Sequence, residues 1–182
     1  MTEIRNLLQG LGQKFNAVQI PAKIGKNRLL LSTRAISDMI EKYCIDRLMI
    51  DYPGMVHPAK EGKAFDVVIE TMPPFNINIK TELRGQYRYD AIWTCSQSVL
   101  ERMPLSLKET LCYLRLEYDL DDFVNISQVS YAGPLIALDD YSIVYDKATG
   151  RMTQGGREVN NRIAKHYNGK HVHLLTNAFT NV

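Results

Sequence analysis

The stretch HPAKEGKAFDVVIETMPPFNINIKTE, residues 57–82, decides how the rest of the chain can be arranged. Its segments FDVVIE (65–70) and FNINIKTE (75–82) are rich in Phe, Val and Ile, a composition that predicts two β-strands. The intervening TMPP carries a pair of prolines, which favour a turn. We therefore expect a β-hairpin here.

The second strand of this hairpin has one polar face. Side chains alternate between the faces of a strand, so Asn78, Lys80 and Glu82 are expected to project together. The other face then carries Ile77, Ile79 and Thr81. Asp66 opens the first strand, and the hairpin can bring it close to the polar face. A carboxylate, a second oxygen ligand and a lysine are suited to bind a hard divalent cation and a phosphate.

This arrangement resembles the PD-(D/E)xK nuclease superfamily, in particular its type II restriction-endonuclease branch. The residues that carry the resemblance are Asp66, the hydrophobic strand after it, the Pro-containing turn and the strand ending in Asn78-Ile79-Lys80-Thr81. The resemblance implies an α/β (α+β) fold, with a central mixed β-sheet flanked by helices in a restriction-endonuclease-like core. It also implies Mg²⁺-dependent hydrolysis of DNA phosphodiester bonds, with Mn²⁺ as a substitute.

The roles follow from position in the resembled motif. Asp66 would be the metal-binding carboxylate and Lys80 the lysine of the active site. The motif has an acid where this chain has Asn78, whose amide oxygen can ligate a metal but brings no charge. Glu82 or a glutamate on a preceding helix would supply the missing charge. The expected catalytic residues are Asp66, Lys80, Glu82 and Glu41, and the expected metal ligands are Asp66, Asn78 and Glu41.

Glu41 belongs to a helix predicted over residues 33–49. Ser32 or Thr33 can cap this helix. Its apolar stripe consists of Ile36, Met39, Ile40, Tyr43, Cys44 and Leu48. Glu41 lies just off the stripe and precedes Asp66 by 25 positions, where the resembled family often places a metal-binding glutamate. The alternative is a solvated surface glutamate beside Lys42.

Basic side chains near the hairpin and the C-terminus are candidates for contacts with nucleic acid. The expected set is Arg84, Arg88, Lys165, Lys170 and His171. The two arginines occur among aromatic residues in LRGQYRYDAIWTC (83–95), and arginine can bind phosphate with two hydrogen bonds. Alternatively, 83–95 is a loop leading to a helix whose aromatic residues join the core. The histidines of KHVHLLTN (170–177) can ligate metal, contact phosphate or lie on the surface.

The remaining periodicity predicts a mixture of helices and strands. Helices are expected over residues 2–15, 96–103 and 156–167. SLKETLCYLRLEYDL (106–120) is expected to begin as a helical turn and to end as a core strand. Two more strands are expected within residues 125–146, and 170–177 reads as a closing strand.

Length and composition place the chain among ordinary globular proteins. Its 182 residues are 45% hydrophobic and 23% charged, consistent with a single domain over 1–182. Three cysteines without CxxC spacing indicate reduced thiols rather than a disulfide framework or a zinc site. The sequence has no signal-peptide run and no membrane-spanning run, so we expect a cytoplasmic protein, bacterial or phage-encoded, without a membrane partner.

Charge is distributed unevenly along the chain. Residues 1–34 carry six Lys or Arg against one acid, and residues 147–182 again carry six against one. Between Glu117 and Asp146 lie seven acids and no Lys or Arg. Basic ends beside an acidic middle can form a positive cleft for a polyanion.

Three classes of function are compatible with these features. The first is a restriction-type, Mg²⁺-dependent endonuclease acting on double-stranded DNA, expected to be a homodimer if its target is a palindrome. The second is a nuclease-like protein that binds nucleic acid without cutting it, with Asn78 marking a lost carboxylate. The third is a small phage-encoded inhibitor of a host protein, whose acidic middle imitates nucleic acid.

Overall fold

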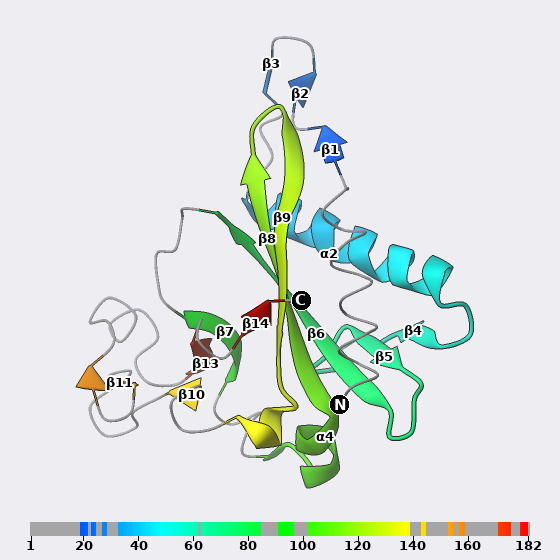
Figure 1. Ribbon diagram of the computed structural model, residues 1–182, viewed down its shortest axis with the longest axis vertical. Coiled ribbons are helices and arrows are strands. Elements are labelled where there is room, and N and C mark those ends of the chain that lie inside the picture. Colours follow the sequence, from blue (N-terminus) through cyan, green and yellow to red (C-terminus); the bar gives the residue numbers. More distant parts are fainter. Residues whose placement is uncertain are drawn as a thin grey trace.

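The computed structural model combines a mixed β-sheet with two α-helices, an α+β arrangement (Figure 1). It describes residues 19–21, 23–24, 27–28, 33–61, 63–84, 91–96, 102–138, 143–144, 153–154, 157–158, 171–175 and 179–181. The central mixed sheet agrees with the sequence-based expectation. The helix predicted for residues 2–15 lies outside the described residues.

Seven strands form the main sheet of the described residues. Their order is β1-β9-β8-β6-β5-β4, and β14 also pairs with β9. The strands are Gln19–Pro21 (β1), Val56–Pro58 (β4), Val67–Ile69 (β5), Phe75–Leu83 (β6), Leu111–Leu120 (β8), Phe123–Ala132 (β9) and Thr180–Asn181 (β14). The central pair β6 and β8 is parallel, whereas the other pairs in this sheet are antiparallel.

The predicted hairpin is present as β5 and β6. Val67 pairs with Ile77 and Ile69 pairs with Phe75, with the proline turn between the strands. Ile77 and Ile79 are buried in the main core, as the alternation predicts for the apolar face. Because β5 has three residues and β6 has nine, β6 extends past the end of β5. The hairpin therefore opens after Ile77.

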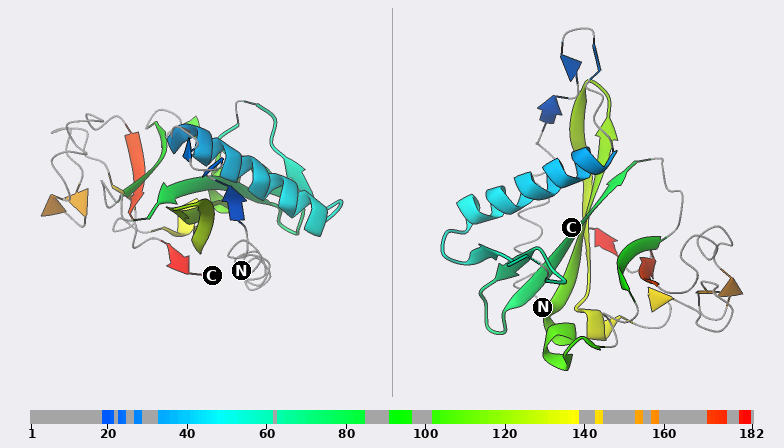
Figure 2. Two further views of the ribbon diagram at one scale, coloured as in Figure 1. Left: turned by 90° about the horizontal axis from the view of Figure 1, so that it is seen from above. Right: turned by 180° about the vertical axis from the view of Figure 1, so that it is seen from behind.

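Helix α2 (Thr33–Asp51) covers one face of the main sheet (Figure 2). The predicted helix is confirmed and ends two residues later than expected. Ile36, Ile40, Cys44 and Leu48 recur every four residues and are all buried in the main core. Burial of each such aliphatic side chain contributes about 1.5–3 kcal/mol, which holds the helix on the sheet. Tyr43, predicted to belong to the apolar stripe, is instead exposed.

Helix α4 (Leu105–Thr110) runs directly into β8, as predicted for residues 106–120. Residues 111–118 of β8 are all buried, because α2 covers one face and a second core covers the other. This second core contains Met103, Leu111, Tyr113, Ala132, Leu135 and Phe179. Leu135 lies in the 3₁₀ helix η1 (Leu135–Ala137). The described part of the chain has no helix long and apolar enough to cross a membrane.

The remaining described strands form three small sheets. One contains β7 (Ala91–Ser96), β10 (Ile143–Val144) and β13 (His171–Leu175); the others pair β11 (Thr153–Gln154) with β12 (Arg157–Glu158), and β2 (Lys23–Ile24) with β3 (Asn27–Arg28). The closing strand predicted over 170–177 is confirmed by β13. The helix predicted over 156–167 is wrong at residues 157–158, and the helix predicted from residue 96 is wrong there, because both places pair as strands.

Candidate functional site

Asp66 lies where β5 and β6 separate. Its backbone N–H donates to the carbonyl of Ile77 at 2.9 Å, and its Oδ2 accepts a hydrogen bond from the N–H of Ile79 at 2.6 Å. The carboxylate thus binds a backbone donor of β6 just beyond the last residue that pairs with β5. This contact fixes the direction of the side chain at the opening of the hairpin.

Asn78 lies on the face of β6 opposite the one that packs against α2. In the parallel register it is level with Tyr113 of the second core. Its Nδ2 donates to the carbonyl of Ala64 at 2.9 Å, so its Oδ1 points elsewhere. Asn78 is only 7% exposed, and its Oδ1 is buried without a hydrogen-bond partner among the described residues. A buried polar atom without a partner costs about 1–3 kcal/mol, so a cation or a donor at this point would be stabilising.

Glu41 on α2 is electrostatically linked to the hairpin. Burial raises the pKa of Glu41, the negative charge of Asp66 raises it further, and the Lys80 ammonium lowers it. Burial likewise raises the pKa of Asp66, while the hydrogen bond from Ile79 and the charge of Lys80 lower it. Two carboxyl groups and one ammonium, from one helix and two strands, therefore act on each other. Glu41, Asp66 and Lys80 are thus near enough for their charges to influence one another.

The Cys44 thiol on α2 also responds to the charges of these acids. Burial raises the pKa of the Cys44 thiol well above its usual range, and the charges of Glu41 and Asp66 raise it further. The thiol belongs to the core and stays protonated. Both carboxyl groups therefore lie close to the same turn of α2, against the sheet.

Other predicted residues lie elsewhere. Arg84 forms an ion pair with Asp119, with Nη1 3.4 Å from Oδ2, and its exposed guanidinium already has an acidic neighbour. Glu82 lies two residues beyond Lys80, level with Glu117 of β8. His171 begins β13 opposite Ser96, and the strand has a register shift between Val172 and His173. The predicted nucleic-acid contacts Arg88, Lys165 and Lys170 lie outside the described residues.

A buried polar network next to Lys80 was not predicted. Arg115 of β8 is level with Lys80, and its Nη2 lies 2.9 Å from Oε1 of Glu117. Its Nε donates to Ser130 at 3.0 Å, and its guanidinium lies 4.9 Å from the ring centroid of Phe179. The i, i+2 spacing of Arg115 and Glu117 in a core strand is the sequence signal that indicates a shared face.

The donor set at the open end of the hairpin suits a hard cation. Carboxylate and amide oxygens are the ligands that Mg²⁺ and Mn²⁺ favour, together with water and phosphate oxygens. Among the described residues, no three His, Cys, Asp or Glu side chains group as metal ligands. The chain matches no protein-family model and no curated protein.

Proposed function

We propose that this protein is a metal-dependent nuclease that hydrolyses DNA phosphodiester bonds. The observation that carries the proposal is the interaction of Asp66 and Lys80 on the hairpin with Glu41 on α2, beside the buried Asn78 Oδ1, which has no hydrogen-bond partner among the described residues. The mixed sheet with α2 on one face is compatible with the restriction-endonuclease-like core that the sequence motif implies. A homodimer on double-stranded DNA is part of the same proposal.

Asp66 and Glu41 are the residues that would hold the divalent cation, and Asn78, on the other face of β6, would reach it at the edge that β5 leaves open after Ile77. Burial raises the pKa of both carboxyl groups, the charge of Asp66 raises that of Glu41 further, and a bound cation would oppose both effects. Asn78 would contribute its Oδ1. The Nδ2 of the same amide donates to the carbonyl of Ala64, whereas Oδ1 has no hydrogen-bond partner among the described residues. When bound, Mg²⁺ would polarise the phosphate and make a water molecule more acidic.

Lys80 would act on the phosphate itself. It lies two residues after Asn78 on the same strand, and its ammonium interacts with both carboxyl groups. A fixed ammonium at this position offsets negative charge that develops on the phosphate and helps to orient the attacking water. The hydrogen bond from the Ile79 N–H would hold the Asp66 carboxylate in position while Lys80 contacts the phosphate.

A cleavage assay with matched variants tests the proposal. The wild-type protein is expected to cut plasmid DNA with Mg²⁺ or Mn²⁺ and to be inactive in EDTA. Asp66→Ala and Lys80→Ala are each expected to lower the rate at least about a hundredfold while the fold persists. The control variants Asp121→Ala, in the turn after β8, and Lys108→Ala, on α4, each remove a charge of the same sign away from the candidate site. Both should therefore retain activity. Equal cleavage by all four variants would reject the proposal.

A second candidate is a nuclease-like protein that binds nucleic acid without hydrolysing it. The observation in its favour is Asn78, because the site has one carboxylate fewer than the resembled motif. It predicts DNA binding that is equally strong with and without a divalent cation, and no cleavage under any metal condition.

The third candidate, an inhibitor whose acidic surface imitates nucleic acid, is less well supported. Glu117 is buried against Arg115 and Asp119 pairs with Arg84, so neither acid contributes a lone negative charge to such a surface.

A further inference from the structure

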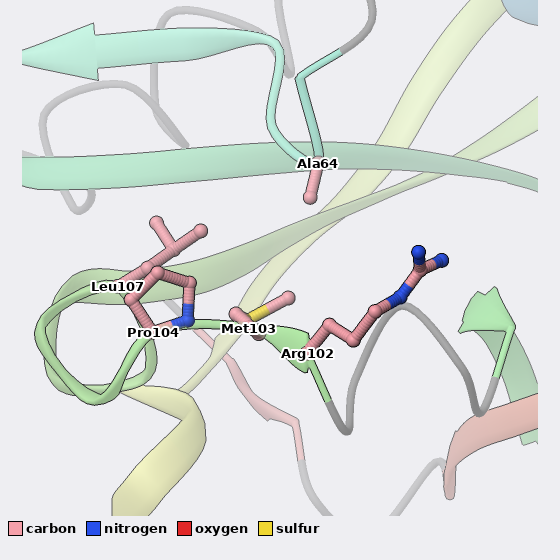
Figure 3. Close-up of a pocket in the computed structure, with 5 residues that line it drawn as sticks. All are labelled: Ala64, Arg102, Met103, Pro104 and Leu107. Carbon is pink, nitrogen blue, oxygen red and sulfur yellow. The ribbon is translucent and has the colours of Figure 1, made fainter.

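A surface pocket lies against Ala64, two residues before Asp66 in the chain. Its volume is about 280 Å³, and it is lined by Ala64, Arg102, Met103, Pro104 and Leu107. Figure 3 shows Ala64 pointing toward Met103 from the hairpin side, with Pro104 and Leu107 on one side of the space and Arg102 on the other. The walls are therefore apolar except for one guanidinium.

The pocket and the candidate site share a short piece of backbone. The carbonyl of Ala64 accepts the hydrogen bond from Asn78, while its methyl group faces the pocket. Asp66 follows two residues later, a separation of at most about 7 Å along an extended chain. A phosphate held near Asp66 and Lys80 would thus place the neighbouring nucleotide within reach of this pocket.

The size and lining of the pocket select one kind of group. At about 280 Å³ it is at the lower limit of ligand pockets, so it suits a single planar ring system rather than a large cofactor. A methionine thioether makes favourable contacts with aromatic rings, and an arginine guanidinium stacks on nucleobases. A base that is still paired inside a duplex cannot enter such a pocket.

We propose that this pocket binds an unpaired nucleobase adjacent to the phosphate at the candidate site. The inference rests on the proposed function, since it assigns the pocket to the same nucleic-acid substrate. The protein would bind one base beside the phosphodiester bond that is hydrolysed. That base is either flipped out of a duplex or part of a single strand. The pocket is the binding site for the ring, and the side chains of Met103 and Arg102 form part of its wall.

Binding to two labelled oligomers tests the assignment separately from cleavage. One probe is a fluorescein-labelled oligothymidine, and the other is an abasic oligomer of the same length with the same phosphates. Anisotropy is measured with Ca²⁺ in place of Mg²⁺ at fixed salt. The wild type should prefer oligothymidine by about tenfold, as expected for one stacked base.

Variants of the pocket should remove this preference. Ala64→Met fills the space from the hairpin side, and Arg102→Gln removes the guanidinium from an exposed position. Both variants should lower the ratio of the affinity for oligothymidine to the affinity for the abasic oligomer toward one. In Ala64→Met the affinity for the abasic oligomer itself should change little. The matched controls Ala137→Met, at an exposed position of η1, and Lys108→Gln, on α4, should keep the wild-type ratio.

An unchanged ratio in either folded pocket variant overturns the proposal. Because Arg102 is exposed, Arg102→Gln tests it even if Ala64→Met does not fold. A ratio near one in the wild type overturns it as well. If the protein cuts no DNA but the pocket variants lose the base preference, the base site stands and the nuclease proposal fails. If it cuts DNA and the ratio never changes, the nuclease stands and the base site fails.

Discussion

Asn78 is the residue at which the candidate site departs most from the resembled motif. Replacing it by Asp adds a third acid at a position that is only 7% exposed, next to Asp66. Without metal, Asn78→Asp is expected to destabilise the protein by about 1–3 kcal/mol, because a buried charge lacks compensation. With Mn²⁺, the added charge should lower the dissociation constant at least about tenfold. Calorimetric titration and urea unfolding in EDTA measure the two effects.

Asn76→Asp is the matched control for this change. Asn76 precedes Asn78 by two residues on the same strand, and its Nδ2 donates to Thr110 rather than facing the candidate site. The control should leave Mn²⁺ affinity at the wild-type value. Equal tightening in both variants would mean that the charge acts at a distance and that Asn78 is not a ligand.

Glu41 makes stability depend on pH with a definite sign. Its pKa is raised from 4.5, chiefly by burial, so the folded protein holds this proton to a higher pH than the unfolded chain does. The metal-free protein therefore loses stability as the pH rises from about 4.5 through the raised value. Glu41→Gln removes this loss and should be more stable than the wild type at neutral pH by up to about 1 kcal/mol.

Unfolding curves in EDTA across the pH range measure this difference. Well below pH 4.5 both proteins are uncharged at this position and should be equally stable. A wild type that gains stability relative to Glu41→Gln as the pH rises would show the opposite sign and reject the interpretation. Saturating Mn²⁺ should reverse the order at neutral pH, since a ligand bound only by the folded state adds stability.

At the scale of elements, β8 is the strand on which both cores depend. Its second face carries the ion pair between Arg115 and Glu117, whose side chains are 7% and 5% exposed. Arg115→Met removes the guanidinium that lies 2.9 Å from the buried Glu117 carboxylate and should cost about 3–5 kcal/mol. The double variant Arg115→Met with Glu117→Leu removes both charges and should recover most of that loss. Urea unfolding measures both, and equal losses in the single and double variants would contradict this account.

The elements that were predicted from sequence share one property: their pattern is local. Helix α2 was predicted from its four-residue apolar repeat, and β5 and β6 from alternating Ile and Val around Pro73 and Pro74. The change from a helical turn to a core strand within residues 106–120 was predicted because the end of this segment alternates. The strand at Arg157 and Glu158 was missed because two residues carry no periodicity, and pairing with Thr153 and Gln154 decides their conformation.

The candidate site was predictable only in part for the same reason. Asp66, Asn78 and Lys80 lie on one hairpin, so their proximity follows from a short motif. Glu41 lies on α2, so its distance from the hairpin depends on how that helix packs on the sheet. The carbonyl of Ala64 and the ion pair of Arg84 with Asp119 depend on tertiary contacts that leave no pattern in the sequence.

For the whole molecule, binding to DNA should depend on salt in proportion to the phosphates contacted. Of the basic candidates, Arg88, Lys165 and Lys170 would each release a counterion, whereas Arg84 is paired with Asp119. The slope of log affinity against log salt should therefore be about −3 for the wild type. Asp119→Asn frees the guanidinium of Arg84, and the slope should steepen to about −4. A flat dependence would exclude binding through phosphates.

The parallel pairing of β6 with β8 has a consequence for the order of folding. Strands β8 and β9 are joined by Asp121 and Asp122 alone, so this hairpin can form within about 1–10 μs. The pair β6 and β8 must instead wait until residues 84–110 close a long loop. A nascent chain that ends before Leu111 therefore exposes the unpaired edge of β6, which favours aggregation. Pulsed hydrogen exchange should show protection of β9 before β6, and simultaneous protection would contradict this order.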